Sequence, residues 1–388
     1  MATVRSPLLE GRDADVPPAP FTSALQVSTC PSGGGDTVIE LPQTIAHRGY
    51  RAAYPENTLA AFRAAIAVGS HALETDLHLS RDGVVVLSHD ATLQRCFGRK
   101  ERIADCDWDF LRTLRTLRAP HEPMPRLVDL LQDLARPELQ HVWLLLDIKR
   151  DDDPDELIDS LAAAFASVPS AKPWNQRILL GCWNTTYVDV CRELLPGFPI
   201  AYIGWSLLYA RKLLRVPNVH FNINYNVLVG PCGSRFVAAA RAARRHVFVW
   251  TVNDEAWMEW SIRKTFDGVI TDDPKLFLDV CERWGSGGGE VIGGRDKEAS
   301  GSDESEGEEK GAERPPVLGV ASVPRLPSDW VLPAPQPLLR VPPRGPIRRL
   351  ARVALWNLLA SVLTPLLFYY SGAMARKRRA KARPHRTP

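Results

Sequence analysis

Short apolar runs alternate with amphipathic stretches through the middle of the chain, from about residue 44 to residue 281. Runs of this kind are typical of buried strands, and they cover residues 44–47, 72–76, 84–89, 142–149, 178–183, 200–205, 220–224, 247–252 and 268–271. Between most of them, apolar residues recur at helical spacing, as in residues 57–68, 126–134, 156–165 and 235–245. This alternation of strands and helices predicts a parallel α/β domain.

The number of strand–helix units favours one parallel architecture over another. Repeated units over about 240 residues match the length and order of a TIM (β/α)8 barrel. A doubly wound sheet is the alternative, but no Gly-rich phosphate-binding fingerprint follows the first run. Nine strand-like runs are one more than a barrel needs, and the link over residues 77–83 is too short for a helix. We therefore expect a barrel over residues 44–284 with one irregular unit, and the pattern leaves open which run is extra.

Both flanks of the predicted barrel lack a pattern that could bury a core. Residues 1–43 are rich in Pro, Ser and Gly without usable periodicity, so we expect a disordered extension. After the barrel the sequence turns glycine-rich, then acidic at 300–313, and residues 315–346 contain ten prolines. We expect residues 285–347 to form a disordered linker that is flexible at first and stiffer where proline is frequent.

A hydrophobic segment with basic flanks follows the predicted linker. Residues 353–370 are apolar apart from four positions, and as a helix they would be about 27 Å long, close to the thickness of a bilayer core. Arginines precede this segment, and seven Lys or Arg side chains follow it between Arg376 and Arg386. A long linker separates the segment from the barrel, so we predict a membrane anchor over residues 348–388 and not a terminal helix of the barrel.

Two arrangements of the anchor remain open. A simple span would carry the seven basic residues across the membrane, against the positive-inside tendency. Pro365 offers a bend, so a shallow hairpin with both flanks on the cytosolic side is the favoured arrangement. We expect a protein that faces the cytosol from the endoplasmic reticulum or a lipid droplet, with the mitochondrial outer membrane as the alternative.

Composition and charge narrow the class of function. With 45% hydrophobic and 24% charged residues, the chain has an ordinary globular composition, which excludes wholesale disorder. Residues 331–388 hold 12 Lys or Arg and no acidic residue, whereas the first 330 residues carry a net charge of −9. A basic tail on an acidic body suits an anionic lipid surface and not a nucleic acid. The seven scattered cysteines form no CxxC pair, so we expect a reducing compartment with neither a disulfide framework nor a zinc site.

Acidic residues stand where predicted strands end, which is the end of a barrel that carries its active site. Glu74 and Asp76 are two positions apart on one run, so both side chains point to the same face. Asp147 and Lys149 repeat this arrangement on a later run. Three carboxylates in one barrel mouth would repel one another, and a divalent cation such as Mg²⁺ or Ca²⁺ would resolve this because it binds oxygen ligands.

Two histidines and an arginine occupy equivalent strand ends. His47 and Arg48 end the first run, and His89 ends the third. The two imidazoles titrate near neutral pH and can serve as a general base and a general acid. Arg48 and Lys149 can neutralise a phosphoryl oxygen. A single histidine at a strand end is more often structural, but the joint occurrence of these groups at successive strand ends favours a catalytic site.

Several motifs occur in an order that resembles a known family. They read HRGYRAAYPENTLAAF, LETDLHLSRDGVVVLSHD, LDIK, VWTVN and DGVITDDP, and they extend from residue 45 to about residue 274. Together they resemble the glycerophosphodiester phosphodiesterase family. The LDIK and VWTVN versions, with the hydrophobic basic tail, most resemble its fungal phosphatidylglycerol phospholipase C branch. The resemblance implies a TIM barrel, a divalent metal ion and acid–base histidines.

The resemblance also implies a role for each residue that matches a family motif. These are the catalytic pair His47 and His89, the metal ligands Glu74, Asp76 and Asp147, the phosphate-binding Arg48 and Lys149, the loop-supporting Glu56 and Asn57, and the substrate-bordering Trp250. The common family pattern has Glu at the position of Asp147, but the fungal branch also has Asp, so Asp147 is kept as a ligand. Core packing is an equally good explanation of Trp250 and of Trp183 and Trp205.

Three functions follow from these observations. The first is a membrane-tethered phospholipase C that converts phosphatidylglycerol to diacylglycerol and glycerol phosphate. The second applies the same chemistry to soluble, deacylated glycerophosphodiesters, and the third is a non-catalytic binder of lipid surfaces. The intact histidines and carboxylates argue against the third. The predicted anchor favours the first, because a soluble substrate gives no reason to tether the barrel. The expected head group carries a hydroxyl next to the phosphoester, since that hydroxyl can attack phosphorus.

Overall fold

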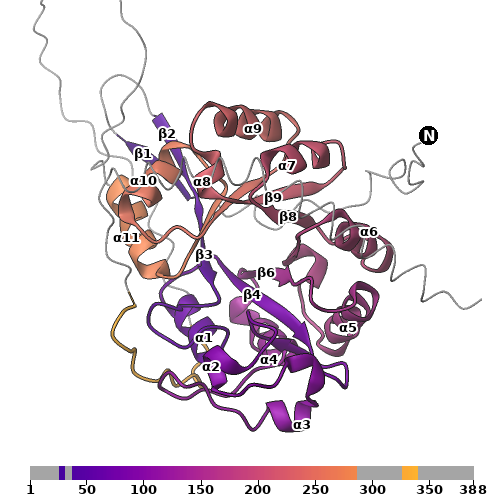
Figure 1. Cartoon of the computed structure of the whole chain (residues 1–388). Helices are drawn as coiled ribbons and strands as arrows, with labels where there is room; N and C mark the ends of the chain where they lie inside the picture. Colours follow the sequence, from indigo (N-terminus) through magenta and orange to yellow (C-terminus); the bar gives the residue numbers. More distant parts are fainter. Residues whose placement is uncertain (1–25, 31–36, 286–325, 340–388) are drawn as a thin grey trace, which may run out of the picture.

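The computed structural model describes residues 26–30, 37–285 and 326–339. Within these residues, eight parallel strands form a closed barrel (Figure 1). The strands are β3 (Gln43–His47), β4 (Ala72–Leu79), β6 (Trp143–Ile148), β7 (Ile178–Cys182), β8 (Ile200–Gly204), β9 (Val219–Asn224), β10 (Val247–Trp250) and β11 (Gly268–Thr271). β3 pairs with β4 on one side and with β11 on the other, and this pairing closes the sheet. Closure confirms the predicted TIM-type barrel and excludes the doubly wound alternative, whose sheet is open.

Helices surround the strands on the outside of the barrel (Figure 1). The principal ones are α1 (Leu59–Ala67), α4 (Leu127–Leu134), α5 (Pro154–Ser167), α6 (Thr185–Leu194), α7 (Leu207–Leu213), α8 (Tyr225–Leu228), α9 (Pro231–Ala242), α10 (Glu255–Arg263) and α11 (Pro274–Arg283). The side chains of Thr58, Asn184 and Ser206 each accept a hydrogen bond from a backbone N–H in the first turn that follows. The four segments predicted from helical spacing overlap α1, α4, α5 and α9.

Alternation along the strands separates the inside of the barrel from its outside. The inner cluster consists of Ile45, Ala72, Trp143, Leu145, Leu179, Ala201, Ile203, Phe248 and Ile270. Outward residues such as Leu144 and Leu146 join the larger core beneath the helices. Asp147 shares the inward face of β6 with Leu145, and Glu74 shares the inward face of β4 with Ala72. The apolar members of each series fill the barrel, and the carboxylates stand at its mouth, where the carboxyl ends of the strands meet.

The extra apolar run is β5 (Val85–Leu87), which is not a barrel strand. It pairs antiparallel with the far half of β4, where Leu87 lies opposite Leu77. Because the link from β4 is too short for a helical crossover, the chain turns back at once, and the backbone N–H of Val84 donates to the Ser80 hydroxyl. The connection to β6 then runs through α2 (Gln94–Phe97), η3 (Ile103–Asp105), α3 (Trp108–Leu111), α4 and η4 (Pro137–Leu139).

Two parts of the flanks have defined structure, so the prediction of disorder is wrong there. β1 (Gln26–Cys30) pairs antiparallel with β2 (Thr37–Leu41) inside the N-terminal extension. Residues 326–339 of the predicted linker lie against the barrel, where Leu326 and Trp330 pack on the main core. The β2 sequence TVIEL is rich in β-branched residues, and the linker segment carries large apolar side chains. In the sequence, neighbouring prolines and glycines obscured the β-branched pattern of β2 and the apolar pattern of residues 326–339.

The predicted membrane anchor over residues 348–388 lies outside the described residues, as do the first 25 residues and the acidic part of the linker. In the part of the chain that the structure describes, no helix is both long and apolar enough to cross a membrane. The anchor therefore stays a prediction from the sequence.

Candidate active site

Three carboxylates meet at the mouth of the barrel. Glu74 and Asp76 come from β4 and Asp147 comes from β6, and strand pairing places Asp76 opposite Asp147. Each residue offers a carboxylate oxygen that lies within 4.8 Å of those of the other two, and all three residues are buried. The structure thus brings together the three side chains that the sequence analysis assigned to a metal ion.

Burial of like charges perturbs these carboxylates. Burial, and then the charges of Asp76 and Asp147, raise the pKa of Glu74 well above its usual range. Burial also acts to raise the pKa of Asp76, but Lys149 and Arg48 hold it well below its usual range. Asp76 Oδ1 is buried and accepts no hydrogen bond of regular geometry. A set of carboxylate oxygens with this surplus of negative charge fits a hard divalent cation such as Mg²⁺ or Ca²⁺.

Two basic side chains lie against the carboxylates. Lys149 Nζ is 2.6 Å from Asp76 Oδ1 and 2.6 Å from Asp147 Oδ2. Arg48 Nε is 3.0 Å from Asp76 Oδ2, and the backbone N–H of Arg48 donates to Glu74 Oε2 at 3.0 Å. Burial acts to lower the pKa of Lys149, but Asp147 and Asp76 outweigh it and raise that pKa. Both side chains are therefore cationic at neutral pH and lie where a phosphate would approach the carboxylate cluster.

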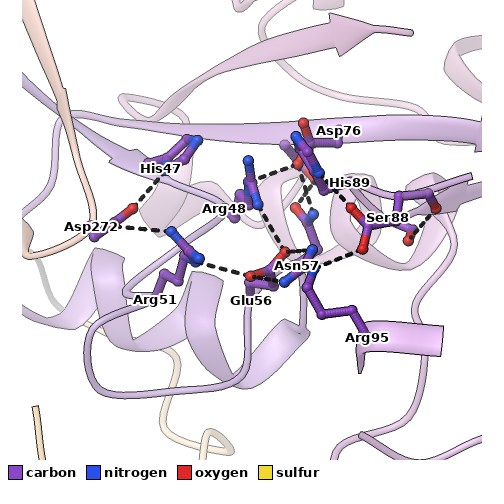
Figure 2. Close-up of polar contacts among 12 residues, drawn as sticks. His47, Arg48, Arg51, Glu56, Asn57, Asp76, Ser88, His89, Arg95 and Asp272 are labelled. Carbon is purple, nitrogen blue, oxygen red and sulfur yellow. Dashed lines mark hydrogen bonds and ion pairs between the residues drawn. The ribbon is translucent and has the colours of Figure 1, made fainter. Parts of the chain in front are cut away.

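Glu56 and Asn57 organise the loop between β3 and α1 (Figure 2). Asn57 Nδ2 donates to Asp76 Oδ2 at 2.9 Å, and Asn57 Oδ1 accepts from the Thr75 hydroxyl at 2.8 Å. The Glu56 carboxylate accepts hydrogen bonds from three guanidinium groups, those of Arg48, Arg51 and Arg95. A carboxylate repels phosphate, so these contacts fit the implied role of loop support and not direct substrate binding.

Each predicted catalytic histidine is paired with a carboxylate. His47 Nδ1 lies 2.6 Å from Asp272 Oδ1, and His89 Nδ1 lies 2.7 Å from Asp90 Oδ1. Figure 2 shows the two imidazoles on either side of Arg48. Burial, and then Arg48, lower the pKa of His47, and burial lowers the pKa of His89. Each lowered pKa favours the neutral ring, which can act as a base, and each carboxylate would stabilise the imidazolium, which can act as an acid.

Asp272 is a site residue that the sequence analysis missed. Besides His47, its carboxylate accepts from Arg51 Nη1 at 3.0 Å and from Asn253 Nδ2 at 2.8 Å. Burial acts to raise the pKa of Asp272, but the hydrogen bond and charge of His47, followed by Arg51, lower it to about 2. Its position could have marked it as a site residue, because Asp272 directly follows an apolar run and His47 ends one. Its partner, however, lies 225 positions away in the sequence.

Three tryptophans form the other side of the mouth. Trp183 follows β7, Trp205 follows β8 and Trp250 ends β10, and their ring centroids are 5.4 to 6.4 Å apart. Trp183 Nε1 donates to Asp147 Oδ1 at 2.6 Å, and Lys149 Nζ lies 5.8 Å from a Trp183 ring centroid. Trp183 and Trp250 also pack against the inner cluster of the barrel. The rings therefore cap the core and border the carboxylates, and substrate contact by Trp250 stays a prediction.

The barrel and its mouth together define a class of enzyme. A cation site beside two histidines and two basic side chains can bind a phosphoryl group, stabilise negative charge on it and transfer protons. These are the requirements for hydrolysis of a phosphate ester. The geometry alone does not select the ester.

Comparison with known proteins identifies the family. Residues 47–276 match the model of the glycerophosphoryl diester phosphodiesterase family. A glycerophosphodiester phosphodiesterase of Caldanaerobacter subterraneus is 23% identical over 253 residues, which are 62% of this chain and 98% of the relative. The glycerophosphodiester phosphodiesterase domain-containing protein 4 of Macaca fascicularis is 30% identical over 276 residues, which are 62% of this chain and 41% of the relative.

A solved structure shares the fold. It is an Oleispira antarctica phosphodiesterase in complex with the product sn-glycerol-3-phosphate, 23% identical in sequence with a TM-score of 0.55. The similarity covers 62% of this chain and 97% of that chain. At this level of identity, the match supports the barrel and not a particular substrate.

The chain belongs to the glycerophosphoryl diester phosphodiesterase family and is a phosphoric diester hydrolase. The family depends on a divalent metal ion, in agreement with the cluster of Glu74, Asp76 and Asp147. The choice between Mg²⁺ and Ca²⁺ and the narrower resemblance to the fungal phosphatidylglycerol phospholipase C branch stay predictions. Family membership, together with the complete set of site residues, argues against the non-catalytic lipid binder.

Proposed function

We propose that this protein hydrolyses glycerophosphodiesters to glycerol phosphate and the corresponding alcohol. The observation that carries the proposal is the carboxylate cluster of β4 and β6, flanked by His47 and His89 and contacted by Arg48 and Lys149. A divalent cation held by the cluster would neutralise charge on the phosphoryl oxygens. Relatives with the name glycerophosphodiester phosphodiesterase support the choice of ester.

The substrate itself supplies a nucleophile for this reaction. The glycerol of a deacylated glycerophosphodiester has a free hydroxyl on the carbon next to the esterified one. One histidine, as the neutral ring, takes the proton of that hydroxyl while its oxygen attacks phosphorus, and the other, as the imidazolium, protonates the departing alcohol. The products of this step are a cyclic phosphate and the free alcohol. Water then opens the cyclic phosphate with the two histidines in exchanged roles, which yields glycerol phosphate.

Arg48 and Lys149 hold the phosphoryl group during these steps, and Asp272 and Asp90 support the histidines. Each imidazole becomes a cation once it has accepted a proton, and the adjacent carboxylate stabilises that cation. The two histidines thus change charge during the reaction, while Arg48 and Lys149 keep the phosphate in place.

A direct assay tests the proposal. The 388-residue chain with Mg²⁺ or Ca²⁺ should release glycerol phosphate and ethanolamine from sn-glycero-3-phosphoethanolamine, and excess EDTA should abolish the release. The His47→Ala and His89→Ala variants should each lose about 10²–10⁴-fold in turnover. Full activity in excess EDTA would contradict the metal assignment, and full activity of either variant would contradict the acid–base pair.

A second candidate keeps the chemistry and changes the substrate to phosphatidylglycerol in a membrane. The observation that favours it is a set of exposed leucines on segments at the mouth of the barrel. Leu208 is 63% exposed on α7, which follows β8, and Leu339 is 63% exposed beside the loop that follows β3. Apolar side chains in such places suit contact with lipid. The basic, hydrophobic sequence after residue 347 is consistent with a membrane-bound enzyme.

The proposed nucleophile discriminates between lipids. The backbone glycerol of an intact phospholipid has no free hydroxyl, so only a hydroxyl in the head group can attack phosphorus. Phosphatidylglycerol has one, and cleavage would release diacylglycerol and glycerol phosphate, whereas choline and ethanolamine heads have none next to the ester. We therefore expect turnover of phosphatidylglycerol vesicles and little turnover of phosphatidylcholine vesicles. Equal rates on both would exclude this mechanism, and no turnover of either would leave the soluble diesters as the substrate.

A further inference from the structure

Residues 326–339, here called the strap, lie on the barrel although a long stretch of sequence separates them from α11. Figure 1 shows this segment running past α1, near the loop that joins β3 to that helix. The strap contains no helix or strand, so its position depends on contacts with the barrel. These contacts fall into two groups, one at each end of the strap.

The first end is anchored on the outer helices. Trp330 lies between two guanidinium groups, with Arg63 Cζ at 5.1 Å and Arg136 Cζ at 5.9 Å from its ring centroid. Asp329 accepts two hydrogen bonds from Arg136, at 2.6 and 2.7 Å. Leu332 and Trp330 both pack against the main core. Cation–π and apolar contacts of this kind fix the position of this end of the strap on the barrel.

The second end is hydrogen-bonded to the loop between β3 and α1. The backbone N–H of Gln336 donates to the Ala53 carbonyl at 2.9 Å, and that of Leu339 donates to the Ala52 carbonyl at 2.9 Å. The Tyr54 hydroxyl donates to the Pro333 carbonyl at 3.0 Å. Three successive residues of the loop therefore contact the strap.

This loop leads directly to the catalytic histidine. The backbone N–H of Ala52 donates to the Asp272 carbonyl at 2.9 Å, so Ala52 links the strap to the residue that pairs with His47. The side chain of Arg51, one position earlier, bridges the carboxylates of Asp272 and Glu56 at 3.0 and 2.9 Å. Movement of the loop would displace both contacts to Asp272.

A second donor holds the same loop from the connection between α3 and α4. Arg118 donates to three backbone carbonyls, those of Arg51, Ala52 and Tyr54. The carbonyls of residues 51–54 pair with no strand, and among the described residues their donors come from Arg118 and from the strap. Among the described residues, the donor to the Ala53 carbonyl is the backbone N–H of Gln336 in the strap. Loss of the strap would therefore remove this hydrogen bond.

We propose that the strap is a positioning element of the active site, which holds the β3–α1 loop so that Arg51 and Asp272 orient His47. This role goes beyond the phosphodiesterase activity and applies to soluble and lipid substrates alike. It also means that Leu339, the last described residue of the strap, lies beside the loop that leads to His47.

A matched pair of proline variants in the full chain tests the proposal. Leu339→Pro removes the N–H that donates to Ala52, whereas Leu338→Pro adds the same residue where no N–H bond to the barrel is present in the described residues. With sn-glycero-3-phosphoethanolamine and Mg²⁺, we expect Leu339→Pro to lower kcat by about three- to tenfold, because it loses the hydrogen bond to Ala52 and so displaces Asp272 relative to His47. KM should stay unchanged, because the strap contacts no phosphate-binding side chain, and Leu338→Pro should behave as wild type.

Amide hydrogen exchange provides a measurement that does not depend on the substrate. The Ala52 amide should exchange faster in Leu339→Pro than in Leu338→Pro, because its bond to Asp272 loosens with the loop. If the assayed diester is not a substrate, this readout still tests the strap. Equal exchange in the two variants, or an equal loss of kcat in both, would overturn the proposal.

A substitution at the anchored end tests the same proposal without proline. Trp330→Ala empties the space between Arg63 and Arg136 and should lower kcat and speed Ala52 exchange as Leu339→Pro does. Trp330→Phe keeps a ring there and loses no hydrogen bond within the described structure, since Trp330 Nε1 is buried without an acceptor. We expect Phe to restore most of the activity. A Trp330→Ala protein with wild-type kcat and wild-type exchange would exclude coupling through the strap.

Discussion

The two sides of the barrel mouth are built on different principles. The side formed by β3, β4 and β6 carries charged groups that hold one another through ion pairs at 2.6 to 3.0 Å. The side formed by β7, β8 and β10 carries three indole rings that pack against one another and against the barrel core. Trp183 links the two sides, since it donates a hydrogen bond to Asp147 and its ring centroid lies 5.8 Å from Lys149 Nζ.

This difference assigns separate tasks to the two sides. The charged side can bind phosphate and move protons, which every phosphodiester requires, so it has little power to choose between alcohols. The aromatic side has no group that titrates near neutral pH, but it offers apolar surface to the rest of the substrate. Changes on the charged side should therefore reduce turnover of all substrates, and changes on the aromatic side should alter the preference among them.

The largest effect is expected at the carboxylate cluster. Glu74→Gln removes a metal ligand and should lower turnover by about 10³-fold, because a bound cation contributes several kcal/mol to phosphoryl-transfer transition states. The same change relieves repulsion from Asp76 and Asp147, so the melting temperature without added metal should rise. Steady-state kinetics and thermal melts would measure both.

The exposed Glu193 of α6 provides a matched control for this change. Glu193→Gln should leave both activity and melting temperature unchanged. A Glu74→Gln protein that keeps its activity, or that melts at a lower temperature than wild type without metal, would contradict the account of the charged side.

An effect of the same order is expected at His47, and a smaller one at its partner Asp272. His47→Ala should cost about 10²–10⁴-fold in kcat/KM, and Asp272→Asn should cost less because the imidazole remains. The Asp272 carboxylate favours the protonated imidazole and so raises the pKa of His47 against the effects of burial and Arg48. Removing that charge lowers this pKa further, so the limb of the pH–rate profile that His47 controls should move to lower pH. A limb that stayed in place or moved upward would exclude His47 as the titrating group.

The smallest effect is expected on the aromatic side. Trp183→Phe keeps a ring but loses the hydrogen bond to Asp147, which should lower kcat by about three- to tenfold on every substrate. Trp205→Phe leaves that bond intact, so it should change KM for one diester relative to another and leave kcat within about twofold. Comparison of kcat and KM on a soluble diester and on phosphatidylglycerol vesicles would separate the two. Equal changes of kcat and KM in the two variants would show that the charged side and the aromatic side do not have separate tasks.

Much of the charged side could be predicted from the sequence, because its members follow from local rules. Side chains two positions apart on a strand share a face, and strands of a parallel barrel end at the same mouth, which is enough to bring Glu74, Asp76 and Asp147 together. His47 and Arg48 lie at an equivalent strand end. The family motifs cover these positions, so the resemblance and the residue pattern led to the same set.

The partners of these residues depend on contacts between distant parts of the chain. Asp272 and His47 meet because β11 closes the barrel against β3, and no local pattern reports that pairing. The role of Glu56 as an acceptor for three arginines likewise depends on Arg95, which reaches it from a different connection. Charge and spacing in the sequence were compatible with many other pairings.

The sequence by itself determined the barrel, the inward-facing carboxylates and the two histidines, since periodicity and strand-end position are properties of short stretches. Only the tertiary structure decided that the run over residues 84–89 folds back beside β4, that Asp272 supports His47, and that residues 326–339 lie beside the catalytic loop. The physical reason is the same in each case. A proline-rich segment or a lone acid has no stable place of its own, and its position is set by donors, acceptors and apolar surface that come together only when distant residues pack.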